Sequence, residues 1–122
     1  MQRKENLQLK NELRQFSGSE NCYANPLFGN YNYNDGVKYL AIKGECYWLI
    51  DYIFSHQILP KIKGQDFQTW KIQVNEDDEA IVTIEDGNDN VLSQLRIGYT
   101  DFPFNEFTLW MIGKTLLLPS EY

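Results

Sequence analysis

The sequence predicts an α+β domain in which N-terminal helices pack on one face of an antiparallel meander of three to four strands. Up to residue 57, apolar residues recur every three or four positions, which is the spacing of helices that face a core. From residue 66 onward, apolar residues alternate with polar ones, which is typical of strands. Short segments rich in Asp, Asn and Gly separate these strands and favour hairpin turns.

The first helix is predicted from Leu9, Leu13 and Phe16, which fall on one side of a helical cylinder, and we expect it to end near Gly18. Residues 17–36 are rich in Gly, Asn and Ser and also contain several aromatic rings. Because rings of this kind pack at the edge of a core, we expect an ordered loop there instead of a linker.

Two further helices are expected before the strands begin. Residues 37–42 follow capping residues and precede Gly44, which favours one or two helical turns. Residues 45–57 are apolar on almost every side of the helical cylinder. A helix of that composition is usually central, so we expect it to lie directly against the sheet.

The strands are predicted at residues 66–74, 80–85 and 91–99, with a solvated turn at residues 75–79 and a second turn at residues 86–90. A fourth element at residues 107–112 is too short and too uniformly apolar to be assigned as strand or helix. In the first strand, alternation places four side chains on one side: Gln68, Trp70, Ile72 and Val74.

Length and composition narrow the class of protein. With 122 residues and 43% hydrophobic residues, the chain is predicted to form a single domain over residues 1–122. The formal charge of −6 is opposite to the basic surface that nucleic-acid binding requires, so we expect no direct nucleic-acid binding. No apolar run reaches the roughly 20 residues that cross a bilayer. Isolated Cys22 and Cys46 suit a reducing compartment, and we expect a cytoplasmic protein.

Five short motifs occur along the chain: Tyr47-Trp48-Leu49-Ile50-Asp51, Phe67-Gln68-Thr69-Trp70-Lys71, Asp86-Gly87-Asn88, Tyr99-Thr100-Asp101-Phe102-Pro103 and Leu118-Pro119-Ser120-Glu121-Tyr122. In this order they resemble a family of small bacterial proteins that is classed as a domain of unknown function. The resemblance runs from about Leu13 to Tyr122. It implies a stand-alone bacterial domain with no assigned cofactor, and it brings no catalytic residues with it.

Three carboxylates are the candidates for chemistry. Asp51 lies within the apolar central helix, where it is either a satisfied structural anchor, the favoured interpretation, or an acid with a raised pKa. Asp101 is expected to fix the turn before Pro103 through hydrogen bonds to the backbone. The alternative is a small enzyme or metal-binding protein in which Asp51, Asp101 and Glu121 share one pocket.

Most familiar catalytic and cofactor-binding motifs are missing from the sequence. His56 is the single histidine, whereas nucleophilic triads and zinc sites need further partners. No phosphate-binding glycine loop occurs, so we expect no cofactor. The segment Asp86 to Asn90 lacks the spacing of a calcium loop, which favours a hairpin turn. His56 is expected to be a half-exposed residue at a helix end.

Aromatic residues are the remaining candidates for binding. They crowd the first half of the chain and build either the core, the simpler interpretation, or a contact surface. Our preferred hypothesis is a non-catalytic bacterial interaction domain that binds a protein partner, or a second copy of itself, through an aromatic patch with an acidic rim. A third hypothesis is an acidic decoy that occupies a DNA-binding protein. The binding candidates are Tyr31, Tyr33, Trp48 and Tyr52.

Overall fold

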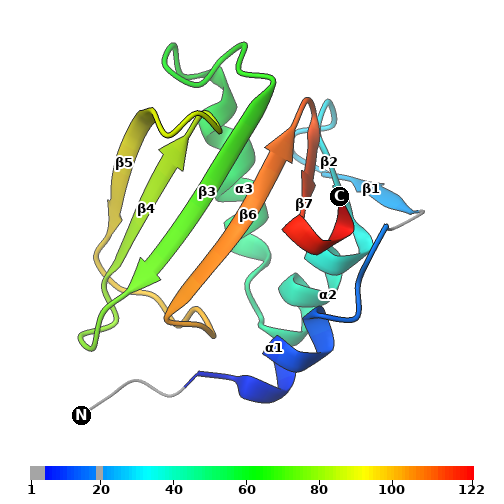
Figure 1. The fold of residues 1–122 in the computed structure, drawn as a ribbon, viewed down its shortest axis with the longest axis vertical. Coiled ribbons are helices and arrows are strands. Elements are labelled where there is room, and N and C mark those ends of the chain that lie inside the picture. Colours follow the sequence, from blue (N-terminus) through cyan, green and yellow to red (C-terminus); the bar gives the residue numbers. More distant parts are fainter. Residues whose placement is uncertain (1–4, 19–20) are drawn as a thin grey trace.

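In the computed structural model, which describes residues 5–18 and 21–122, three α-helices pack on one face of a sheet of seven strands (Figure 1). The α+β class is therefore as predicted. The helices are α1 (Leu7–Leu13), α2 (Asp35–Lys43) and α3 (Tyr47–Ser55), and the short 3-10 helices are η1 (His56–Ile58) and η2 (Pro119–Glu121). The strands are β1 (Cys22–Ala24), β2 (Asn32–Asn34), β3 (Phe67–Val74), β4 (Ala80–Glu85), β5 (Val91–Ile97), β6 (Glu106–Ile112) and β7 (Thr115–Leu117).

The three helices form in the predicted regions, but α1 ends at Leu13, so Phe16 and the predicted end near Gly18 lie outside it. At the start of α1, the Asn6 side chain accepts a hydrogen bond from the Leu9 backbone N–H at 3.0 Å, and Leu9 and Leu13 are buried. Helix α2 ends at Gly44, as expected. In α3, the buried residues Leu49, Ile50, Ile53 and Phe54 face the interior. Because α3 lies behind the middle of the sheet (Figure 1), its predicted central position is confirmed.

The long strands also follow the predicted pattern. Strands β6, β3, β4 and β5 are neighbours in that order, and every pairing among them is antiparallel. In β3 the burial alternates, so that Gln68, Trp70, Ile72 and Val74 are all buried against the helices. Residues 107–112, which the sequence left unassigned, belong to β6. The two hairpin turns lie where the polar segments predict them, between β3 and β4 and between β4 and β5.

The prediction of a purely antiparallel sheet of three to four strands is wrong. The sheet has the order β1-β2-β7-β6-β3-β4-β5, and β2 runs parallel to β7, with Asn32 opposite Thr115. Strands β1, β2 and β7 have three residues each, too few for an alternating pattern to be recognised. Strands β1 and β2 lie within the predicted loop at residues 17–36, of which residues 19 and 20 fall outside the described residues.

The core lies between the helices and one face of the sheet. Its largest fully buried side chains include Trp70 from β3, Phe54 from α3, and Phe102 and Phe104 from the segment between β5 and β6. Phe102 and Phe104 contact each other edge-on, with ring centroids 5.8 Å apart. No helix of the described residues is long and apolar enough to cross a membrane.

Candidate functional site

Glu121 is a structural residue at the C-terminal end of the fold. It is only 4% exposed, and its two carboxylate oxygens accept hydrogen bonds from backbone N–H groups. Oε2 accepts from Gly36 in the first turn of α2 at 2.8 Å, and Oε1 accepts from Leu118 at 2.9 Å. A Cβ atom at Gly36 would lie 2.6 Å from Oε1, so only glycine fits there. We call Gly36, Leu118 and Glu121 the Glu121 site; it joins η2 to the start of α2.

Asp51 anchors the loop between β1 and β2. Its Oδ1 accepts a hydrogen bond from Asn25 Nδ2 at 2.7 Å. The other side-chain atom of buried Asn25, Oδ1, accepts from the backbone N–H groups of Leu27 and Phe28 at 2.7 and 2.8 Å. This chain of bonds fixes the loop onto α3, which is the anchoring role that the sequence favoured for Asp51.

Asp101 is exposed on the segment that follows β5. The side chain that stabilises this turn is that of the preceding residue, because Thr100 Oγ1 accepts from the Phe102 backbone N–H at 3.1 Å. Thr100 itself is buried, and its N–H donates to the Asp78 carbonyl at 2.8 Å. The bonds that hold this turn therefore leave Asp101 at the surface.

The three carboxylates thus belong to three separate elements: α3, the segment after β5, and η2. Within residues 5–18 and 21–122, no group of three or more His, Cys, Asp and Glu residues is placed to hold a metal ion. Two of the three, Asp51 and Glu121, are engaged in hydrogen bonds that hold loops or helix ends in place.

The Phe-Gln-x-Trp motif builds a buried polar network. Gln68 is 1% exposed and exchanges two hydrogen bonds with the Gln57 amide, at 2.8 and 3.0 Å. Gln68 Oε1 also accepts from the Trp70 indole N–H at 2.9 Å, and Gln57 donates to the Ile53 carbonyl at 3.1 Å. The network ties β3 to the end of α3, so this motif has a structural explanation.

The Asp86-Gly87-Asn88 motif forms the expected hairpin turn. Asp86 Oδ1 accepts from the backbone N–H groups of Asn88 and Asn90 at 2.8 and 3.2 Å. The hydrogen bond from the Asn90 side chain, followed by that from the Asn88 backbone, holds the pKa of Asp86 below its usual value. Gly87 has a φ of +87°, and a Cβ there would lie 2.6 Å from the Phe67 ring, which explains the glycine.

The contacts and burial of the single histidine and the two cysteines are also defined by the structure. His56 is half-buried at the C-terminal end of α3, as predicted, with Nδ1 2.6 Å from the Tyr52 carbonyl oxygen. Both cysteines are free. Cys22 is exposed, whereas Cys46 is buried, and burial followed by the negative charge of Asp101 raises the pKa of its thiol to about 12.

The four aromatic candidates divide into two groups. Tyr33 is buried, which raises the pKa of its phenol, and Tyr31 stacks on Phe54 with ring centroids 5.4 Å apart. These two therefore belong to the core and its edge. Trp48 and Tyr52 are half-buried on α3 and contact each other edge-on at 6.4 Å. They lie where a partner can reach them.

Trp48 forms one wall of a groove of about 290 Å³ between α3 and the end of β5. Ile97 and Tyr99 also line this groove, and Tyr99 is 73% exposed. The carboxylate of Asp101 lies in the same groove, which combines aromatic rings with a negative charge. We call this the acidic groove, lined by Trp48, Ile97, Tyr99, Thr100 and Asp101. Sequence analysis identified Trp48 and Asp101 but missed Tyr99, which counted only as the end of a strand.

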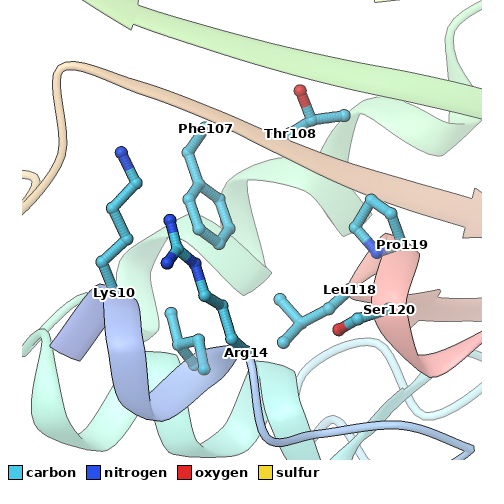
Figure 2. A pocket seen from close by; sticks show the side chains of 8 residues that line it. Lys10, Arg14, Phe107, Thr108, Leu118, Pro119 and Ser120 are labelled. Carbon is cyan, nitrogen blue, oxygen red and sulfur yellow. The ribbon is translucent and has the colours of Figure 1, made fainter.

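A second cavity, of about 320 Å³, lies between α1, β6 and η2 (Figure 2). Lys10 and Arg14 extend side by side from α1 along one wall, and the Phe107 ring lies beside Arg14. Leu118, Pro119 and Ser120 face them from the other side. We call this the cationic pocket; its lining is Lys10, Leu13, Arg14, Phe107, Thr108, Leu118, Pro119 and Ser120. Sequence analysis missed it, although the four-residue spacing of Lys10 and Arg14 is a visible signal.

Comparison with known proteins identifies a family. The model of a family described as "Family of unknown function (DUF6876)" matches residues 7–122 of the chain. No curated protein and no solved structure matches it.

Proposed function

The chain belongs to DUF6876, a family of unknown function, and from that premise we propose that it is a non-catalytic protein-interaction domain that binds an extended segment of a partner along β5. The observation that carries this proposal is the position of β5, which is an unprotected edge of the sheet next to the acidic groove. Added strands of this kind use backbone hydrogen bonds for affinity and side-chain pockets for specificity.

Strand β5 has the properties of an edge that can accept another strand. It pairs with β4 on one side and is the last strand in the sheet order. Natural edge strands are usually blocked by proline, by lysine or by very short length. Strand β5 has seven residues without either residue type, and its single charge, Arg96, is paired with Glu79 at 3.0 Å. A register shift opposite Glu85 affects only its first residues.

The acidic groove supplies the side-chain contacts that an added strand needs. Ile97 belongs to β5 itself, and Trp48 and Tyr99 line the same groove. Every second side chain of an added strand points toward the helical layer, because side chains alternate across a sheet. Such side chains would meet Trp48 and Tyr99, and partly exposed Tyr and Trp rings often supply much of the binding energy of an interface.

Charge selects the kind of partner. Asp101 lines the groove, and the chain as a whole carries a formal charge of −6. A partner segment with Lys or Arg beside its apolar residues is attracted to this surface, whereas a second copy brings the same negative charge. The occupant proposed for β5 is therefore a basic, extended segment of a different protein.

The test is a selection of ten-residue peptides from a displayed library against the full chain. We expect the enriched peptides to alternate apolar residues with Lys or Arg. Tyr99→Ala should weaken their binding by at least about tenfold, because it removes an exposed ring at the groove. Asp101→Asn should weaken peptide binding less than Tyr99→Ala does. Its effect should be larger at low salt than at high salt, because salt screens the charge of Asp101.

Ile81→Ala is the matched control, because Ile81 is also an exposed apolar residue of the sheet but points to the face away from the helices. Peptide binding should be unchanged in this variant. The proposal is overturned if Tyr99→Ala leaves binding intact, if Ile81→Ala weakens it equally, or if sedimentation shows a dimer that Tyr99→Ala dissociates.

A further inference from the structure

We propose that the cationic pocket binds a small organic carboxylate whose body is flat and apolar. This site is separate from the acidic groove, since it is built by α1, β6 and η2, whereas the groove is built by α3 and β5. It does not depend on the protein-binding function proposed above.

The positive charge of this pocket is concentrated. Lys10 and Arg14 are four residues apart, so they lie on the same side of α1 and its end (Figure 2). Like charges at this spacing destabilise a helix, and a bound anion would offset that repulsion. No acidic residue is among the described residues that line the cavity, although the chain carries six more acidic than basic residues.

The two cations are weakly engaged by the rest of the protein. Lys10 Nζ lies 3.6 Å from Glu5 Oε2, while the other oxygen of Glu5 accepts from the Asn105 backbone N–H at 2.8 Å. The Arg14 guanidinium donates to Asn11 Oδ1 at 3.5 Å, which is long for a hydrogen bond. Within the described part of the chain, no carboxylate forms an ion pair with Arg14. Its planar fork therefore remains available for a carboxylate.

The apolar wall of the pocket selects the body of the ligand. The position of the Phe107 ring is fixed, because it stacks on the Phe104 ring with centroids 4.9 Å apart and 12° between the planes. Leu118 and Pro119 face it across the cavity (Figure 2). A flat body can lie between these surfaces while its carboxylate reaches Arg14 and Lys10. Inorganic phosphate would leave the apolar wall uncovered, so an organic anion fits better.

The volume sets the size of the ligand. About 320 Å³ is at the lower end of the range for small-molecule sites, which suits a body of one or two fused rings. Ser120 and Thr108 also line the cavity, and because Ser120 is exposed, its hydroxyl can donate a further hydrogen bond to an anion.

The experiment uses 2-naphthoate as the probe and 2-naphthylmethanol as its neutral counterpart, each titrated into the ¹⁵N-labelled full chain and followed by NMR. We expect 2-naphthoate to shift the backbone signals of residues that line the cavity. We also expect it to bind at least about tenfold more tightly than the alcohol, because charge-assisted hydrogen bonds to a guanidinium are strong.

Three variants separate a specific site from general attraction. Arg14→Gln should weaken 2-naphthoate binding about tenfold, and Arg14→Lys should restore part of it. Lys63→Gln changes the net charge equally at an exposed position outside the pocket, and it should leave binding unchanged. Because Arg14 and Lys63 are both exposed, these variants are expected to fold. Equal binding of acid and alcohol, shifts confined to other surfaces, or no effect of Arg14→Gln would each overturn the proposal.

Discussion

In the Glu121 site, both oxygens of a buried carboxylate accept backbone N–H groups, whereas in the acidic groove the carboxylate of Asp101 lies at the surface beside Trp48 and Tyr99. Both residues belong to short motifs near the end of the chain. The comparison shows that the presence of a carboxylate in a motif does not reveal whether that carboxylate stabilises the fold or binds a partner. A carboxylate whose oxygens already hold the fold together contributes stability, and a carboxylate left at the surface remains available to a partner.

The largest expected effect follows from changing the buried member of this pair. Glu121→Gln keeps the shape but turns an acceptor oxygen into an NH₂ group that faces a backbone N–H of Gly36 or Leu118. We expect the free energy of unfolding to fall by about 2–3 kcal/mol, as for a buried polar group that loses its partner. Urea titration followed by tryptophan fluorescence measures this change.

Asp101→Asn is the matched variant in the groove, and it should change the free energy of unfolding by less than about 0.5 kcal/mol. If Asp101→Asn destabilises the protein as much as Glu121→Gln, then Asp101 holds the fold together. The contrast between the two carboxylates would then be wrong.

A smaller effect is expected at the buried amide pair, which extends the comparison to neutral groups. Gln68→Leu leaves the Trp70 indole N–H and the Gln57 amide without their partner, which should cost about 1–3 kcal/mol of unfolding free energy. Replacing Gln57 by Leu as well removes one of these unsatisfied groups. The double variant should therefore be less destabilised than the sum of the two single variants, and strict additivity would contradict the network.

The last comparison concerns the two cysteines, one exposed and one buried, and it leaves stability at neutral pH unchanged. It measures whether solvent and reagents reach the buried thiol of Cys46 in the folded protein. Cys22 should react with a thiol-specific disulfide reagent at pH 8, and Cys46 should react only on unfolding. Cys22→Ser is the control, since it should abolish the fast reaction. Fast labelling of Cys46 in that variant would show that the interior near Asp101 is open.

The pKa of the Cys46 thiol also gives a direction with pH. In the folded protein this pKa is raised to about 12, whereas an unfolded thiol ionises near 9. The folded state therefore keeps a proton that the unfolded chain releases, so the stability that is fully present below pH 9 is lost as the pH rises toward 12. Replacement of Cys46 by Ala should flatten this decline in urea titrations between those pH values.

The sequence predicted the parts of the fold that depend on local periodicity. Helices α1 and α3 and strands β3 to β5 each carry enough residues for an apolar pattern to be visible, and α2 was predicted from its capping residues. Strand β6 was left unassigned, because its apolar run has no alternation. Strands β1, β2 and β7 carry too few residues for such a pattern, and β2 contains two Asn residues, which are rare in strands. Their pairing is decided by contacts with distant segments, and a local pattern does not contain that information.

The candidate sites divide in the same way. Trp48 and Tyr52 were recognised because aromatic residues crowd the first half of the chain, and Asp101 because it is a carboxylate at a predicted turn. The cationic pocket was missed because Lys10 and Arg14 face residues near 107 and 119, and only the folded chain brings these segments together. The anchoring roles of Asp51 and Glu121 likewise depend on backbone groups far away in the sequence.

The parallel pairing of β2 with β7 has a consequence for how the protein folds during synthesis. Thr115 Oγ1 donates to Asn32 Oδ1 at 2.7 Å across a separation of 83 residues, and strand β1 depends on β2 in turn. Strands β1 and β2 therefore cannot join the sheet until the ribosome has made β7, which is their neighbour in the strand order. Strands β3, β4 and β5 can pair with one another as soon as each emerges. Contacts over such long separations slow folding, and closure of this side of the sheet should be a late step.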